Sequence, residues 1–376
     1  MKINEIPTPC YVVYEDRLCR NLEIINSVER LAGVNIIMAF KANALWRSFP
    51  IIARYNRDFT ASSLNELRLG TETLGGEAHS YCPAYTEATI DEFCRLSTHI
   101  TFNSLNQWAR FKDVAARYNT STGLRVNPEC SVIETDIYNP MLPGSRFGVT
   151  AEMIGNKLPE GIEGLHFHAL CESSAEDLQL VLEAFESKFG HLLPQIKWVN
   201  MGGGHLMTRQ GYNIDLLVSL LNDFRGRYPW IKVILEPGSA FTWRTGDLLT
   251  SVVDVVENHG VKTAIIDASF ACHMPDTLEM PYKPAISESV SPTNRTFAYR
   301  LGGNSCLSGD FVGDWHFDHP LKSGERLTLE DMNHYTNVKT TMFNGIEHPS
   351  IALVKTDGSI EFLRRYTYED YKSRMD

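Results

Sequence analysis

The sequence predicts a (β/α)8 TIM-like barrel joined to a second, all-β domain. Three observations predict this fold. Eight short apolar segments with strand character alternate with amphipathic stretches up to about residue 243. Unusual polar residues follow several of these segments, and parallel barrels carry their functional groups at the carboxyl ends of their strands. Beyond about residue 244 the pattern changes to segments rich in Val, Thr, Tyr and Phe, separated by Gly, Pro and Asn.

Each expected barrel strand is a short apolar run bounded by turn residues. The eight strands are Asn35–Phe40, Asp58–Ser62, His79–Cys82, His99–Asn103, Gly123–Asn127, Gly164–His168, Lys197–Met201 and Lys232–Glu236. Between them, Ala175–Phe189 and Ile214–Tyr228 have the apolar spacing of amphipathic helices. Leu248–Val256, Arg295–Gly302 and Ile351–Leu363 are segments that indicate the β-domain.

The expected domain boundaries follow this change of pattern. The barrel should cover residues 20–243 and the β-domain residues 244–376, with the N-terminal segment 1–19 joined to the β-domain. A chain of 376 residues is long enough for one large and one smaller domain with a sizeable core.

Composition narrows the class of protein. The net charge of −11 disfavours nucleic acid as a partner and slightly favours a cationic ligand. The eight cysteines never form a Cys-x-x-Cys pair, which argues against a zinc site and against a disulfide framework. The first residues lack a secretion signal pattern, and no apolar run approaches membrane-spanning length. We expect a cytoplasmic protein without a membrane partner.

Lys41 is the most informative residue of the chain, because it ends an apolar strand-like run and places a single amine beyond it. A partly desolvated amine with few carboxylate partners is what Schiff-base chemistry requires. Any one lysine is more commonly a surface residue with its amine in water. The interpretation therefore depends on support from other segments.

Two later segments supply that support. Gly202, Gly203 and Gly204 directly follow a strand, where backbone N–H groups can approach a phosphate without hindrance from side chains. Glu236 ends the eighth strand and places a carboxylate at the same barrel mouth. An amine, a phosphate cradle and a carboxylate together predict pyridoxal 5′-phosphate, with Lys41 holding the cofactor and Glu236 keeping the pyridine nitrogen protonated.

His166 and His168 are two residues apart and share a face of their expected strand. One of the two could stack on the cofactor ring, and we favour His166 as a satisfied core histidine. A His-x-His pair also occurs in metal-dependent barrel hydrolases, but in those the pair belongs to the first strand and the lysine to mid-barrel. The order is reversed here, so no metal is expected.

The second domain contributes a glycine-rich loop that contains Cys306, Asp310 and Asp314. If this loop reaches the barrel mouth, Cys306 could protonate the substrate carbanion while the two acids bind substrate amines. A buried cysteine beside an exposed turn is the ordinary alternative.

These segments, in this order, resemble the fold-type III pyridoxal phosphate decarboxylases, the group that contains diaminopimelate, arginine and ornithine decarboxylases. Within that group the resemblance is strongest to the carboxynorspermidine (carboxyspermidine) decarboxylases. It rests on Gly164–Glu172, Lys197–His205, His273–Asp276 and the Cys306–Asp314 loop, and it extends over nearly the whole chain.

The resemblance implies decarboxylation of carboxynorspermidine to norspermidine, or of carboxyspermidine to spermidine, in polyamine biosynthesis. It implies that Lys41, His168 and Cys306 are catalytic, and that Cys306 and Asp310 reach across a homodimer interface into a shared site. It also implies that Gly238 and Tyr335 contact the cofactor and that the substrate is bound by Arg146, Ser239, Asp276, Asp310 and Asp314.

One departure concerns substrate choice. Members of this family usually carry an acid directly after Glu-Pro-Gly, and this chain has Ser239. The alternatives are another fold-type III decarboxylase of the diaminopimelate, ornithine or arginine type, or a racemase, which Glu236 disfavours. A pyridoxal phosphate-binding homologue without catalytic activity is a further alternative, although it would be expected to have lost Lys41 or Cys306.

Overall fold

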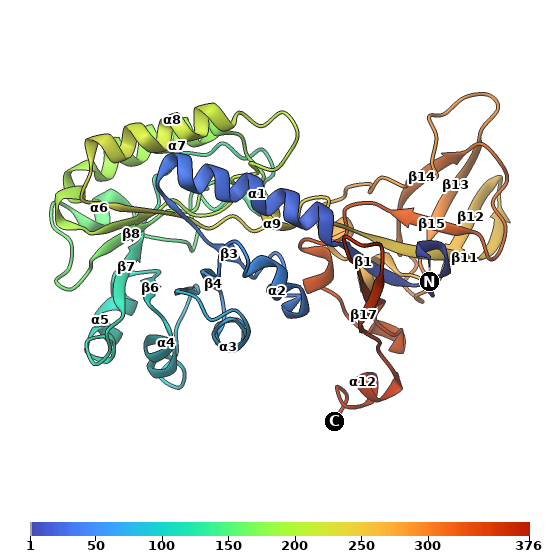
Figure 1. Ribbon diagram of the computed structural model, residues 1–376, viewed down its shortest axis with the longest axis horizontal. Coiled ribbons are helices and arrows are strands. Elements are labelled where there is room, and N and C mark those ends of the chain that lie inside the picture. The colour runs from blue at the N-terminus through green and yellow to red at the C-terminus, as the bar shows by residue number, and fades with distance from the viewer. Residues whose placement is uncertain (1) are drawn as a thin grey trace. The chain divides into compact units, whose positions relative to one another are not determined.

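The structure, a computed structural model, describes residues 2–376 and divides the chain into two compact units. One unit comprises residues 19–241, and the other comprises residues 1–18 together with 242–376. These bounds lie one or two residues from those expected from the sequence. Figure 1 shows the helices and strands of both units.

The first unit is an eight-stranded parallel barrel, which confirms the predicted fold. Its strands are β2 (Asn35–Ile36), β3 (Met38–Ala39), β4 (Phe59–Ala61), β5 (Ala78–Tyr81), β6 (His99–Phe102), β7 (Ser121–Arg125), β8 (Gly164–His166), β9 (Trp198–Asn200) and β10 (Lys232–Leu235). The segments β2 and β3 are two parts of the first barrel strand, interrupted at Ile37. Because β2 pairs with β10 and β3 pairs with β4, this strand closes the barrel.

Helices surround the barrel strands and cover them from outside, and α3, α4 and α5 follow one another along one side (Figure 1). The helices of the chain are α1 (Glu15–Ala32), α2 (Phe49–Ile52), α3 (Leu64–Thr73), α4 (Ile90–Leu96), α5 (Leu105–Ala115), α6 (Ala151–Ile154), α7 (Ala175–Phe189), α8 (Ile214–Arg227), α9 (Ser239–Thr242), α10 (Phe270–His273), α11 (Asp276–Glu279) and α12 (Tyr368–Lys372). None of the helices within residues 2–376 is long and apolar enough to cross a membrane.

Helix α7 shows why these segments are helical. Ser174 caps its first turn, because the Ser174 hydroxyl accepts a hydrogen bond from the Asp177 N–H and the Asp177 carboxylate accepts one from the Ser174 N–H. Leu178, Val181 and Phe185 recur at helical spacing and are buried. The predicted helix over residues 175–189 is confirmed with the same ends.

The second unit is built around a mixed sheet. Its strands are β1 (Cys10–Tyr14), β11 (Gly246–Asn258), β12 (Val261–Ile266), β13 (Phe297–Gly302), β14 (Phe311–Phe317), β15 (Arg326–Leu329), β16 (Ser350–Val354) and β17 (Ile360–Arg364). The N-terminal strand β1 lies between β11, to which it is antiparallel, and β16, to which it is parallel. The predicted N-terminal segment therefore belongs to this unit.

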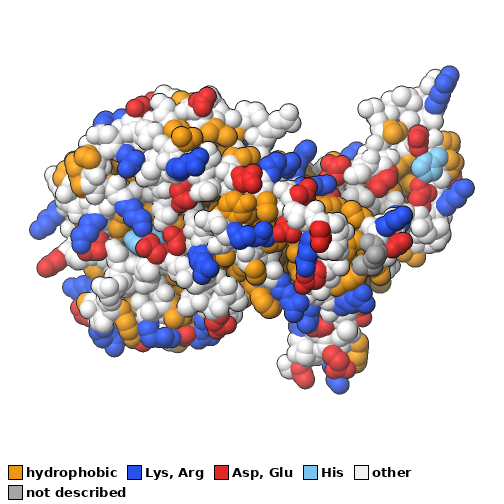
Figure 2. Space-filling view, viewed as in Figure 1, with side chains coloured by type: hydrophobic (Ala, Val, Ile, Leu, Met, Phe, Trp, Pro, Cys, Tyr) orange, Lys and Arg blue, Asp and Glu red, His pale blue; other side chains and the backbone are white. Residues whose placement is uncertain are grey.

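Charged side chains of both signs are interspersed over the face of the molecule that Figure 2 shows. The excess of acidic residues in the sequence therefore does not form one large patch on that face. All eight cysteines are free thiols, of which Cys171 and Cys306 are exposed.

The amino-terminal end of the barrel is filled by aromatic rings. The Trp198 indole occupies space that side chains at Gly123 or Gly164 would take, since a Cβ atom there would come within 2.2 Å of the indole. The His79 and His99 rings stack with centroids 4.1 Å apart, and the edge of His99 meets Trp198. Burial and the charge of Lys232 lower the pKa of His99 to about 4.

This low pKa predicts acid sensitivity of the barrel. Between pH 6.5 and 4 the unfolded chain takes up a proton at His99 that the folded chain does not, so the free energy of unfolding falls as pH falls. The free energy of unfolding changes by about 1.4 kcal/mol per pH unit where the unfolded chain binds one proton more than the folded chain. In the unsubstituted protein the midpoint of unfolding, measured by circular dichroism, should fall between pH 7 and pH 5. We expect this fall to be smaller in His99→Gln. His191→Gln, at an exposed position, should keep the drop seen in the unsubstituted protein. An equal drop in the His99 variant would contradict the prediction.

Candidate active site

The carboxyl ends of the barrel strands bring three predicted residues together. Lys41 follows β3, His168 follows β8 and Glu236 follows β10. The Lys41 Nζ atom lies 3.4 Å from His168 Nε2, and His168 Nδ1 lies 3.9 Å from a carboxylate oxygen of Glu236. Residues separated by nearly 200 positions in the chain thus form one contiguous polar cluster.

Burial is the largest influence on the pKa of Lys41. It lowers the pKa of the Lys41 amine; the Glu236 carboxylate opposes this shift and the nearby Arg125 guanidinium adds to it. Burial and the charges of Lys41 and Arg125 also lower the pKa of His168 well below its usual range. A larger fraction of Lys41 is therefore the neutral, nucleophilic amine at neutral pH than for a surface lysine.

The Glu236 carboxylate is buried and ionised. Burial acts to raise its pKa, but the neighbouring His166, His168 and Lys41 outweigh this effect and lower the pKa well below the usual range. The Asn200 amide donates a hydrogen bond of 2.9 Å to its Oε2 atom. A buried carboxylate held in this way is suited to a cationic partner such as a protonated pyridine nitrogen.

His166 is a core residue, as predicted, but it is not a satisfied one. Its side chain is 1% exposed, and its Nε2 atom lies 3.2 Å from Glu236 Oε1. Neither ring nitrogen has a well-aligned hydrogen bond among residues 2–376. The edge of the ring packs against Tyr81, with the centroids 5.3 Å apart. His166 therefore contacts Glu236 and helps to lower the pKa of that carboxylate.

The three glycines after β9 have distinct roles. The Gly202 N–H donates to the Asn200 side-chain oxygen and the Gly203 N–H donates to His168 Nδ1, each at 2.8 Å. Both N–H groups are therefore used within the barrel, and we narrow the predicted phosphate contact to the Gly204 N–H. Gly202 and Gly204 have φ angles of +74° and +89°, and a Cβ at Gly204 would lie 2.3 Å from the Leu170 carbonyl group.

Two further barrel residues belong to this cluster and were missed in the sequence. Asn200 joins the carboxylate of Glu236 to the glycine loop. Arg125 is buried with its guanidinium 4.6 Å from the ring centroids of both Tyr81 and Phe147. The available signal was a polar residue at the end of a strand: Asn200 follows Trp198 and Val199, and Arg125 follows Leu124.

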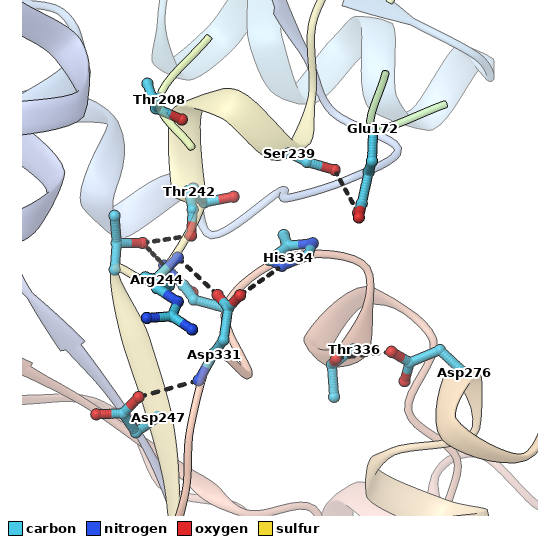
Figure 3. Close-up of polar contacts among 12 residues, drawn as sticks. Glu172, Thr208, Ser239, Thr242, Arg244, Asp247, Asp276, Asp331, His334 and Thr336 are labelled. Atoms are coloured by element: carbon cyan, nitrogen blue, oxygen red, sulfur yellow. Dashed lines mark hydrogen bonds and ion pairs between the residues drawn. The ribbon is translucent and has the colours of Figure 1, made fainter. Parts of the chain in front are cut away.

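The other predicted barrel residues differ in their burial. Arg146 is exposed, and its guanidinium covers the Phe147 ring at 4.2 Å. Gly238 packs closely on the Lys41 segment, since a Cβ there would lie 2.5 Å from Ala42 Cβ. Ser239 is buried and its hydroxyl donates to Glu172, a contact that Figure 3 shows.

In the second unit, Asp276 offers an unused carboxylate oxygen. Its Oδ2 atom accepts hydrogen bonds from Tyr282 at 2.8 Å and Thr336 at 2.9 Å. Its Oδ1 atom is buried and has no hydrogen-bond partner among the described residues. Tyr335, the residue before Thr336, has a φ angle of +54°, which is strained for a side chain of this size. An unused carboxylate oxygen and a strained backbone are both features of ligand sites.

The loop of Cys306 is held by Asp310. The Asp310 carboxylate is buried and accepts hydrogen bonds from the Ser269 hydroxyl, the Ala271 N–H, and the N–H and hydroxyl of Ser305. A carboxylate with this many internal donors has little capacity left for a substrate amine. We therefore propose that Asp310 shapes the loop, in place of the predicted substrate contact.

Cys306 itself is exposed, and its backbone N–H donates to the Asn344 side chain at 2.7 Å. Asp314 lies on β14, where its half-exposed carboxylate accepts a hydrogen bond from Arg300 at 3.2 Å. This surface ion pair gives no independent support to a substrate contact at Asp314.

The known proteins to which this chain is similar are decarboxylases. The family model described as "Pyridoxal-dependent decarboxylase, C-terminal sheet domain" matches residues 11–333. Carboxyaminopropylagmatine decarboxylase from Synechocystis sp. is 45% identical over 374 residues, which cover 100% of this chain and 97% of that protein. The carboxynorspermidine/carboxyspermidine decarboxylase of Campylobacter jejuni is 40% identical over 385 residues, with 100% of both chains covered.

Solved structures show the same relationship. The crystal structure of carboxynorspermidine decarboxylase complexed with norspermidine, from Campylobacter jejuni, has a TM-score of 0.91 and 39% identity. The match covers 98% of this chain and 100% of that one. Diaminopimelate decarboxylase from Helicobacter pylori complexed with L-lysine has a TM-score of 0.83, with 99% and 98% of the two chains covered. At 18% identity, this second likeness concerns the fold alone.

Proposed function

Because this chain belongs to the pyridoxal-dependent decarboxylase family, we propose that it decarboxylates a carboxylated polyamine, with carboxynorspermidine and carboxyspermidine as the first substrates. The product would be norspermidine or spermidine, and the reaction would take place in the cytoplasm. The observation that carries this proposal is the partly buried Lys41 amine, 3.4 Å from His168, in a cluster that includes an ionised Glu236.

The residues of the barrel fit pyridoxal 5′-phosphate. Lys41 has the lowered pKa that lets its amine bind the cofactor aldehyde, and Glu236 has the charge that holds a proton on the pyridine nitrogen. Gly204, whose φ angle of +89° favours glycine, would offer its N–H group to a phosphate oxygen. When bound, the cofactor supplies an electron sink for the electron pair that remains at Cα after carbon dioxide departs.

The remaining steps are assigned to this chain's own side chains. His168 is held by the Gly203 N–H in a fixed orientation beside Lys41 and would pack on the cofactor ring. Tyr335 would contact the phosphate, and the unused oxygen of Asp276 would bind a substrate amine. The Cys306 thiol would return a proton to Cα.

A second substrate is favoured by one comparison. The relative from Synechocystis sp., which is 45% identical over 97% of its length, is named for carboxyaminopropylagmatine. That compound ends in a guanidinium group where the polyamines end in an ammonium group. Ser239, which stands where the family pattern has an acid, is the residue we associate with a changed choice between these ends.

The test of the proposed function is carbon dioxide release by the purified holoenzyme. Carboxynorspermidine, carboxyspermidine, carboxyaminopropylagmatine, diaminopimelate and ornithine are supplied separately at equal concentration. We expect release from at least one of the first three and little from the last two. Release from diaminopimelate or ornithine alone would overturn the polyamine assignment, and release from none of the five would overturn the proposed function.

We also propose that two copies of the chain share their active sites, with Cys306 completing the site of the other subunit. Lys41→Ala and Cys306→Ala subunits should each be slow alone and should recover activity when they are mixed and allowed to exchange. Random pairing restores one intact site in half of the dimers, so recovery should reach about a quarter of the unsubstituted rate. No recovery, although sedimentation shows that mixed dimers have formed, would place both groups in the same subunit.

A further inference from the structure

The loop after β8 and the segment after β10 place a carboxylate and a hydroxyl together. The Glu172 Oε1 atom accepts a hydrogen bond of 3.4 Å from the Ser239 hydroxyl. Figure 3 shows the two side chains pointing toward each other from different parts of the chain. Ser239 is buried and Glu172 is partly exposed, so the carboxylate lies at the boundary between protein and solvent.

The backbone holds Glu172 in a defined conformation. Its φ angle is +48°, which is uncommon for a residue with a side chain and is found preferentially at functional sites. The Arg209 guanidinium donates to the Glu172 carbonyl oxygen at 3.1 Å. The next residue, Ser173, donates its N–H to the Gly204 carbonyl at 2.8 Å. The carboxylate is therefore presented by a fixed loop that is joined to the glycine segment.

The charge of Glu172 is not neutralised by the protein. No lysine, arginine or histidine forms an ion pair with Glu172 among the described residues. Arg209 binds its backbone, and within residues 2–376 the only side-chain partner of the carboxylate is the Ser239 hydroxyl. A half-buried carboxylate that keeps an oxygen without a protein donor is suited to a cationic ligand.

This pair belongs to the same barrel mouth as Lys41. Ser239 directly follows Gly238, which packs on Ala42, the residue after Lys41. Cys171, which precedes Glu172, lies close enough to Lys41 that each group influences the pKa of the other. A substrate bound beside Lys41 would therefore be able to extend toward Glu172 along the wall of the same barrel.

We propose that Glu172, presented by Ser239, is a specificity-determining residue that accepts a cationic nitrogen of the substrate chain; this inference rests on the proposed function. A carboxylated polyamine carries positive charge along its chain and would meet an uncompensated carboxylate. Diaminopimelate carries a second carboxylate at its distal end, which the charge of Glu172 would repel. The one side chain thus favours one class of substrate and disfavours the other.

The test is Glu172→Gln in the holoenzyme, with the best polyamine substrate of the unsubstituted protein. Because one charge-assisted hydrogen bond is lost, we expect KM to rise about 10- to 100-fold. The kcat value and the absorbance band of the bound cofactor should change little, because Lys41 and Glu236 are untouched. Ser239→Ala should raise KM by a smaller factor, and Glu183→Gln, on the exposed face of α7, serves as the matched control.

A binding measurement separates this inference from the proposed function. Calorimetric titration of the holoenzyme with norspermidine should show a matching loss of affinity in the Glu172→Gln variant, and inhibition by diaminopimelate should become stronger. Unchanged KM and unchanged norspermidine affinity in an active protein would overturn the role of Glu172. An unsubstituted protein that releases carbon dioxide from none of the substrates would instead overturn the proposed function. If Glu172→Gln fails to hold cofactor, KM and norspermidine affinity are compared in two other variants. These are Glu172→Asp, which keeps the charge, and Ser239→Ala.

Discussion

Replacing Lys41 with alanine is expected to abolish both cofactor retention and turnover. The amine is the group that would bind the cofactor aldehyde, and its burial lowers its pKa so that the neutral form is accessible. We expect kcat to fall by roughly 10³-fold or more, as is typical when a covalent catalyst is removed. The absorbance band near ~420 nm, which reports cofactor bound to lysine, should disappear. Carbon dioxide release and the absorbance spectrum measure the two effects separately.

Two variants serve as controls for this result. Lys41→Arg keeps a cation at the same place but cannot bind the aldehyde, so it should fail in the same way. Lys188→Ala removes a surface lysine whose partner is Glu129, and it should keep both the band and the rate. Substantial decarboxylation by Lys41→Ala, with a circular dichroism spectrum like that of the unsubstituted protein, would refute the assigned role of this lysine.

Replacing Glu236 with glutamine is expected to slow the reaction without releasing the cofactor. Glutamine keeps the size of the side chain but removes the charge that the low pKa of Glu236 maintains. The pyridine nitrogen would then lose its proton, and the electron sink would weaken. We expect kcat to fall about 10²- to 10³-fold, which is the range observed when one preorganised electrostatic group is lost. The cofactor band should persist, because Lys41 is intact.

Glu163→Gln is the matched control, because Glu163 directly precedes β8 and pairs with Lys197 on the surface, at the amino-terminal end of the strands. It should leave kcat within about twofold, as expected for a surface ion pair. If Glu236→Gln retained the full rate with cofactor bound, the pyridine nitrogen would not depend on this carboxylate, and the assigned role would be wrong.

The fold was predictable because its signals are local. Apolar runs of strand length alternate with helical spacing, and capping residues such as Ser174 mark where a helix begins. The eight predicted barrel strands and both named helices are present, with differences of a few residues at their ends. The predicted strand that ended at His168 stops at His166, because the chain leaves the sheet before the second histidine.

The site was predictable only in part, because residue types do not reveal hydrogen-bond partners. Lys41, His168 and Glu236 stand at strand ends, so the barrel topology alone places them at one mouth. The sequence offered no way to know that Gly202 and Gly203 use their N–H groups for Asn200 and His168. Nor could the sequence reveal that the Asp310 carboxylate accepts hydrogen bonds within its own loop.

By itself, the sequence determined the order of strands and helices and the chemistry that each strand end offers. These properties depend on side-chain periodicity and on neighbours in the chain, which the sequence states directly. The tertiary structure alone decided which polar atoms remain available for a ligand. Availability depends on burial and on partners far away in the chain, as for the unused oxygen of Asp276 and the carboxylate of Glu172 beside Ser239. Contacts over such separations arise only when the barrel closes and its loops converge.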